Sequence, residues 1–169
     1  AYYDAQASGD METISGLNTY LNDIQKIKVE ELSKYIESYP QLDVYTKPGL
    51  TDNTYVAYVC SEVKFYDLET TIPGMQTYYI GQDENGNYYI NNGTYDDTVS
   101  SYIKEVTLQD DVVDLNNQTS AEYNDLLASD AELADYLDQI ASTIDISVGQ
   151  QLAALNASRS EANENTTYL

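Results

Sequence analysis

One continuous strand pattern, at residues 55–66, constrains this chain more than any other feature. Its residues are mostly aromatic and β-branched, and these residue types favour a pleated, half-buried strand. Two shorter strand patterns follow at residues 75–82 and 88–91, and Asn85-Gly86 joins them. Asn-Gly is the strongest short-range signal for a β-hairpin, because both residues tolerate a positive φ. The middle of the chain is therefore predicted to be an antiparallel β-meander.

Helical patterns precede this meander. Residues 1–8 are typical of the end of a helix that Gly9 closes, and Asp10 caps the next helix. The apolar spacing over residues 11–39 fits either one helix or two. Pro40 is predicted to end the helical part, because the residue before a proline is disfavoured in the α region. A first short strand is then expected at residues 42–47.

Helical patterns also follow the meander. Two capping boxes, at residues 119–122 and 129–132, predict the starts of two short helices. The predicted fold class is α+β. Residues 1–107 should form a domain in which N-terminal helices pack on a curved antiparallel sheet of about four strands. Residues 108–145 should form an extension of short helices packed on it, and residues 146–169 a polar tail or linker.

Charge and composition exclude several functions. With 7 Lys and Arg against 29 Asp and Glu, the net charge of −22 repels nucleic-acid phosphates and anionic lipid. No apolar run reaches the roughly 18 residues of a membrane-spanning helix. There is no His, which is the commonest general base and the commonest transition-metal ligand. Cys60, the only cysteine, lies inside the long strand pattern and is interpreted as a buried small hydrophobe.

The acidic clusters are not interpreted as metal-binding sites. Residues 83–87 carry oxygen ligands at close spacing, but Gly86 comes too early for the calcium loop of an EF-hand, and a strand follows. A hairpin turn is the preferred interpretation. Asp110, Asp111 and Asp114 fit the start of a helix, where the helix dipole favours negative charge. No metal ligand and no cofactor is assigned.

Tyrosine dominates the aromatic residues, with 18 Tyr, one Phe and no Trp. The strand at residues 55–66 alternates between two faces. The face that includes Val59 and Phe65 is more apolar and is expected to meet the helices. The other face is mixed and carries Tyr58, Glu62 and Tyr66. A register error of one residue would exchange the two faces.

The chain opens with Tyr2-Tyr3-Asp4-Ala5 and Ser8-Gly9-Asp10, and helices then lead into the sheet. In this it resembles the NTF2-like superfamily, whose members share a cone-shaped α+β fold. Further motifs are similar to uncharacterised cell-envelope proteins of Gram-positive bacteria. These motifs are Tyr39, Val44-Tyr45-Thr46-Lys47-Pro48-Gly49, Tyr55-Val56, Lys64, Pro73-Gly74, Tyr79, Asp83-Glu84-Asn85-Gly86 and Ala128-Ser129-Asp130-Ala131-Glu132-Leu133.

This resemblance covers about residues 1–142 and implies a location and a fold. Such domains often follow a membrane anchor and sometimes precede an SH3-like wall-binding module. The expected location is therefore extracellular. An upstream anchoring segment is also expected, because the chain opens at Ala1, without Met, inside a helical pattern.

The resemblance leaves two functional hypotheses. The first is a non-catalytic envelope module that acts as a spacer or binds a protein, a cell-wall component or a small molecule. The alternative is an isomerase, lyase or hydrolase that uses a tyrosine-lined cone pocket. Ketosteroid isomerase, a member of the superfamily, needs an Asp base and an oxyanion hole formed by Tyr and a protonated acid. The pocket candidates here are Tyr58, Glu62, Tyr66, Tyr78 and Tyr88. None is assigned a catalytic role, because no acid lies in a clearly apolar segment.

Overall fold

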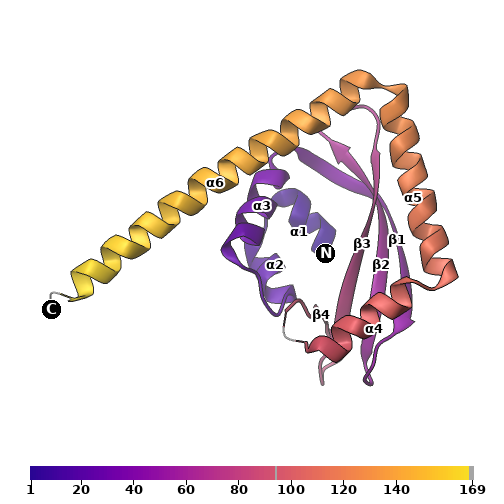
Figure 1. Cartoon of the computed structure of the whole chain (residues 1–169), viewed down its shortest axis with the longest axis horizontal. Helices are drawn as coiled ribbons and strands as arrows, with labels where there is room; N and C mark the ends of the chain where they lie inside the picture. The colour runs from indigo at the N-terminus through magenta and orange to yellow at the C-terminus, as the bar shows by residue number, and fades with distance from the viewer. Residues whose placement is uncertain (94, 168–169) are drawn as a thin grey trace.

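The computed structural model describes residues 1–93 and 95–167, with side chains up to residue 162. Helices α1 (Tyr2–Ser8), α2 (Met11–Leu17) and α3 (Asp23–Ser33) come first (Figure 1). Four strands follow, namely β1 (Ile36–Pro48), β2 (Thr54–Phe65), β3 (Ile72–Gln82) and β4 (Tyr88–Ile90). Helices α4 (Asp97–Thr107), α5 (Asp110–Ser129) and α6 (Ala131–Thr167) complete the described chain. The fold class is α+β, as predicted.

The sheet is an antiparallel meander with strand order β1-β2-β3-β4, which confirms the central prediction. Gly86 has a φ of 83° in the turn between β3 and β4. In that turn the Asp83 carboxylate accepts hydrogen bonds from the backbone N–H groups of Asn85 (2.9 Å) and Asn87 (2.8 Å). Asp83 therefore stabilises a hairpin turn.

The N-terminal helices are closed and capped as predicted. Gly9 ends α1 with a φ of 69°, and the Asp10 carboxylate accepts a hydrogen bond from the backbone N–H of Thr13 at 3.1 Å. Two helices, α2 and α3, then occupy residues 11–33. A reciprocal capping box between Asn22 and Gln25 starts α3. This second cap resolves the choice between one helix and two.

The prediction that helix continues to Pro40 is wrong. Helix α3 ends at Ser33, and β1 already begins at Ile36. Proline is tolerated in β1 because this strand lies at the edge of the sheet and because its register with β2 shifts between Ser38 and Gln41. An edge position or a bulge needs no N–H from the proline.

The C-terminal helices are longer than predicted. Thr119, expected to cap a helix, lies inside α5 and donates its hydroxyl hydrogen bond to the carbonyl oxygen of Leu115 at 3.0 Å. The second predicted capping box, at residues 129–132, does mark the start of a helix, but the capping residue is Asp130 and not Ser129. The Asp130 carboxylate accepts a hydrogen bond from the backbone N–H of Leu133. Helix α6 then continues through the predicted polar tail to Thr167. The sequence has no proline beyond Pro73 that would interrupt it.

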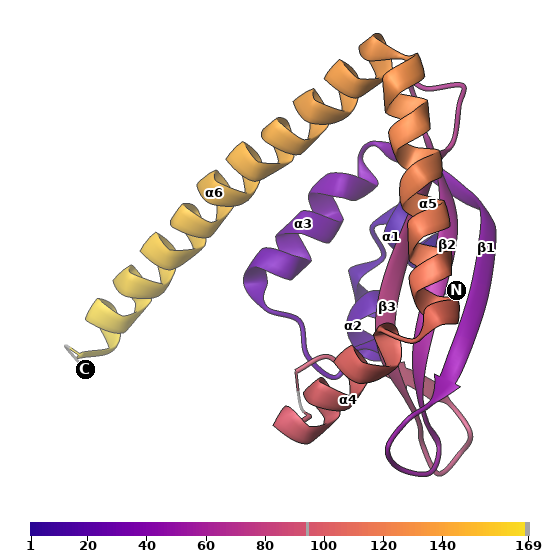
Figure 2. The same ribbon diagram turned by 45° about the vertical axis from the view of Figure 1, so that its right-hand side comes forward.

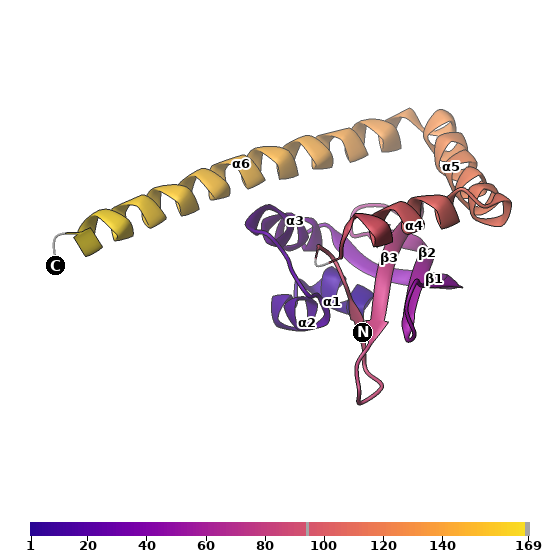
Figure 3. The same cartoon turned by 60° about the horizontal axis from the view of Figure 1, so that its bottom comes forward.

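Helices cover the sheet on both faces (Figure 3). We name the α1 face after the helix that packs on it, and it includes Val44, Val59 and Tyr78. The α5 face includes Tyr58 and Glu62 and is covered by α4 and α5. The prediction that the Val59 face meets helices is correct, but the opposite face meets them as well.

Two hydrophobic clusters hold these layers together. The cluster on the α5 face joins Val56, Tyr58 and Tyr79 to Val112 of α5. The larger cluster packs α3 and α6 against one end of the sheet, and its buried residues are Ile27, Ile36, Phe65, Ile72, Leu133, Ile140, Ile144 and Val148. In the described part of the chain, no helix is both long and apolar enough to cross a membrane.

Candidate functional site

A groove of about 270 Å³ lies on the α1 face, between the N-terminal helices and the sheet. The side chains that line it are almost all tyrosine or aliphatic. They include Tyr2, Tyr3, Leu17, Val44, Val59, Tyr78, Ile80 and Tyr88. Val44 and Tyr88 are largely exposed, so the groove is open to solvent on these sides. Its lining is typical of a site for an apolar ligand.

Four tyrosines form one wall of this groove and the packing behind it. Tyr2 and Tyr3 are neighbours on α1, and their rings meet edge to face at a centroid distance of 5.8 Å. Tyr2 also meets Tyr78 at 5.8 Å, and Tyr3 meets Tyr39 at 4.8 Å. Edge-to-face contacts of this kind are favourable for aromatic rings. The cluster therefore fixes α1 on β1 and β3.

These phenols stay protonated at neutral pH. Burial raises the pKa of Tyr78, and the neighbouring Tyr3 adds to the effect. Burial likewise raises the pKa values of Tyr2 and Tyr3, and it raises that of Tyr39 to about 12. The hydroxyls of Tyr3 and Tyr78 are 3.2 Å apart and share one hydrogen bond. They can orient a ligand, but they do not serve as bases near pH 7.

The groove has no carboxylate, amine or thiol side chain in its lining. Among its lining residues, no Asp, Glu, Lys, Arg or Cys is present. Ketosteroid-isomerase chemistry needs a carboxylate base in the pocket. The lining of this groove does not supply that carboxylate.

The five predicted pocket residues do not converge. Tyr78 and Tyr88 line the groove. Tyr58 lies on the other face, is 1% exposed, and shares a hydrogen bond with the Thr107 hydroxyl at 2.9 Å. Tyr66 follows the end of β2 and is 60% exposed. Tyr58 thus fills the core, and Tyr66 is a surface residue.

Glu62 lines a separate polar pocket of about 190 Å³ on the α5 face. Asp43 of β1 and Glu122 of α5 line it too, and Lys and Arg are absent from its lining. Lys64, which neighbours Glu62 in sequence, instead forms an ion pair with Glu37 at 3.1 Å. The predicted acid and the groove tyrosines are therefore on opposite sides of the sheet.

Asp111, at the start of α5, has a structural role. The Asp111 carboxylate pairs with the Lys47 ammonium, and this hydrogen bond lowers the pKa of Asp111. The pair joins β1 to α5. Among the described residues, no group of three potential ligands could hold a metal ion.

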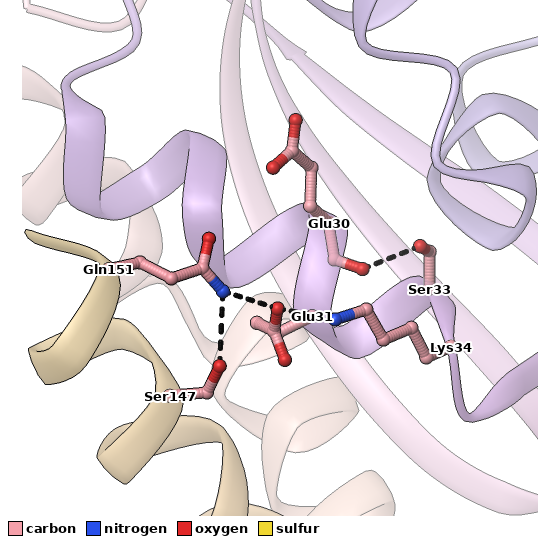
Figure 4. Close-up of polar contacts among 6 residues, drawn as sticks. All are labelled: Glu30, Glu31, Ser33, Lys34, Ser147 and Gln151. Carbon is pink, nitrogen blue, oxygen red and sulfur yellow. Dashed lines mark hydrogen bonds and ion pairs between the residues drawn. The ribbon is translucent and has the colours of Figure 1, made fainter. Parts of the chain in front are cut away.

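The one buried carboxylate of the described chain, Glu31, lies between α3 and α6 (Figure 4). It accepts hydrogen bonds from the Lys34 ammonium at 2.6 Å and from the Gln151 side-chain amide at 2.5 Å. The bond from Lys34 is the main cause of its lowered pKa. Glu31 lies on α3 and its partner Gln151 lies on α6, so this hydrogen bond links the two helices.

Sequence reasoning missed several groove residues. Leu17 and Val44 carry no chemical signal, since an aliphatic residue on a helix or strand is usually core. Tyr2 and Tyr3 were noticed only as part of a resemblance. Their adjacency on one helical turn, in a chain with 18 Tyr and one Phe, is the signal that could have identified them.

Comparison with known proteins adds no relationship. Neither a protein-family model, nor a curated protein, nor a solved structure shows significant similarity to this chain.

Proposed function

We propose that this chain is a non-catalytic, extracellular NTF2-like module of a cell-envelope protein, and that its groove on the α1 face binds an apolar ligand. The ligand would be a small molecule or an apolar side chain of a partner. The observation that carries the proposal is the lining of the groove, which combines tyrosine rings and aliphatic side chains without a carboxylate, amine or thiol side chain.

The NTF2-like assignment is supported by the order of the elements. Helices precede an antiparallel sheet, and the first of them packs on one face of that sheet. The motifs described above favour the envelope location. If the module is extracellular, protease added to intact source cells should digest it. Complete protection until the cells are lysed would contradict this location.

The enzymatic alternative needs a buried ionisable group that faces a cavity. Glu31 is buried but bonded to α6, and Glu62 faces a different pocket from the tyrosines. Burial raises the pKa values of Tyr3 and Tyr78, so these two hydroxyls remain neutral near pH 7. These placements support binding as the function of the groove.

Nile red provides a test, because it is neutral and fluoresces strongly only in apolar surroundings. We expect the wild-type protein to enhance its emission. Val44→Trp should abolish most of this enhancement, because Val44 lines the groove and is 58% exposed, so a larger side chain fills the groove without entering the core. Thr46→Trp is the matched control, since Thr46 lies two residues further along the same strand and does not line the groove. Equal losses in both variants, or no enhancement by the wild-type protein, would overturn the proposal.

A further inference from the structure

Residues 41–47 of β1 form an unprotected sheet edge. Among the described strands, β1 pairs with β2 alone, and from Gln41 its register is continuous to Pro48 opposite Tyr55. Both register shifts and Pro40 lie before Gln41, and Pro48 is the last residue of the strand. Bulges and prolines are among the means by which proteins block edge strands, and here they protect the two ends of β1 but not residues 41–47 between them. Residues 40–46 are all exposed, and Figure 2 shows β1 along the rim of the molecule.

An added strand would meet two different surfaces along this edge. Side chains of a strand alternate between faces, so every second residue of the added strand would lie on the α1 face beside Leu42 and Val44. The remaining residues would lie on the α5 face beside Asp43 and Tyr45. The first surface is apolar and continues into the tyrosine groove.

The second surface is acidic. Asp43, Glu62 and Glu122 line one pocket there, without a Lys or Arg in its lining. Lys47, the nearby cation on β1, is already paired with Asp111. The whole chain adds a net charge of −22, which attracts cations over a longer range.

We infer that residues 41–47 of β1 bind an extended peptide of a partner protein by strand addition, and that this peptide alternates apolar and basic residues. Backbone hydrogen bonds at the edge supply affinity, while the two faces supply specificity. Apolar side chains pack on the α1 face, and basic side chains reach the acidic pocket. A second copy of the chain fits the edge poorly, because two molecules of charge −22 repel each other. The inference adds a partner class to the proposed module and does not depend on what occupies the groove.

The test uses a blocked synthetic peptide, Lys-Val-Lys-Val-Lys-Val-Lys, added to the isotopically labelled full chain. A control peptide, Lys-Lys-Lys-Lys-Val-Val-Val, has the same composition and charge but does not alternate. We expect the alternating peptide to bind more tightly. It should also slow amide hydrogen exchange at residues 41–47, because their outward N–H groups become bonded.

Two charge reversals test the acidic face. Asp43→Lys should weaken binding of the alternating peptide about tenfold, because it places like charges side by side. Asp138→Lys, on the exposed side of α6, changes the net charge equally and should alter binding less than about twofold. Asp43 does not line the groove, so Asp43→Lys should leave the Nile red signal intact. Failure of this inference is thereby distinguishable from failure of the proposed function.

Three results would overturn the inference. Equal affinity for both peptides would indicate simple attraction of a polycation to an acidic protein. Protection of amides outside residues 41–47 would place the peptide elsewhere. Protection of residues 41–47 that rises with protein concentration, without peptide, would assign the edge to a second copy of the chain.

Discussion

Tyr58 on the α5 face is 1% exposed and shares a hydrogen bond with Thr107, whereas Tyr88 on the α1 face is 57% exposed and lines an open groove. Helix length explains the difference. Helix α5 has 20 residues and is about 30 Å long. It therefore covers most of the length of the longer strands, which extend about 40 Å. Helix α1 has 7 residues and reaches only about 10 Å. The same residue type therefore fills a core on one face and lines an open groove on the other.

The largest expected difference comes from truncating one tyrosine on each face. Tyr58→Ala should lower the free energy of unfolding by about 3–5 kcal/mol, because it opens a cavity in the core. Tyr88→Ala should lower it by less than about 1 kcal/mol, since this side chain is mostly exposed. Urea denaturation of both variants measures the two values. Similar losses would show that the two faces are equally closed.

A smaller effect is expected at the contact between α3 and α6. Glu31→Ala should cost about 1–3 kcal/mol, because the Gln151 amide loses its buried partner. Glu30→Ala is the matched control, since Glu30 is an exposed neighbour on the same helix. Hydrogen exchange along α6 should accelerate in the Glu31 variant alone. Equal behaviour of the two variants would exclude a special role for Glu31.

Removal of a single tyrosine hydroxyl from each face should have still smaller effects. Tyr58→Phe should lower the free energy of unfolding by about 1 kcal/mol, because it leaves the half-buried Thr107 hydroxyl without this partner. Tyr78→Phe should cost less than about 0.5 kcal/mol, because its hydrogen bond to Tyr3 is longer, at 3.2 Å. Thermal and urea unfolding of both variants would measure this. A larger loss for Tyr78→Phe would mean that the groove hydroxyls are structural.

Alkaline pH should lower the free energy of unfolding through the buried tyrosines that pack around α1. The pKa of Tyr39 is raised by burial to about 12 in the folded chain, against an ordinary value of 10.0. Between these pH values the unfolded state releases a proton that the folded state retains, so the free energy of unfolding falls as pH rises. Urea denaturation at a series of pH values should show the fall, and Tyr39→Phe should reduce it. An unchanged slope in Tyr39→Phe would contradict this assignment.

Much of the fold could be predicted from local signals. The alternation at residues 55–66, the Asn85-Gly86 turn and the Asp10 cap each depend on neighbouring residues alone. The change from helix to strand after Ser33 could not be predicted, because the apolar spacing typical of a helix continues beyond Ser33. Pro40 also fits the pattern of a residue that follows a helix end.

The site depends on contacts between distant segments and was predicted only in part. Tyr78 and Tyr88 were identified as pocket candidates, but Tyr58 and Glu62 lie on the other face. Both faces of β2 are apolar enough to be covered, so the alternation alone did not show which one stays open. That outcome depends on the lengths of α1 and α5 and on where each helix packs.

The most direct test of the open groove is an NMR titration of the tyrosine rings with p-cresol, a neutral aromatic probe. We expect chemical-shift changes for Tyr2, Tyr78 and Tyr88 on the α1 face, with Tyr58 and Tyr102 on the α5 face unchanged. Changes at Tyr58 and Tyr102, or none at any tyrosine, would contradict the claim that the α1 face carries the binding groove.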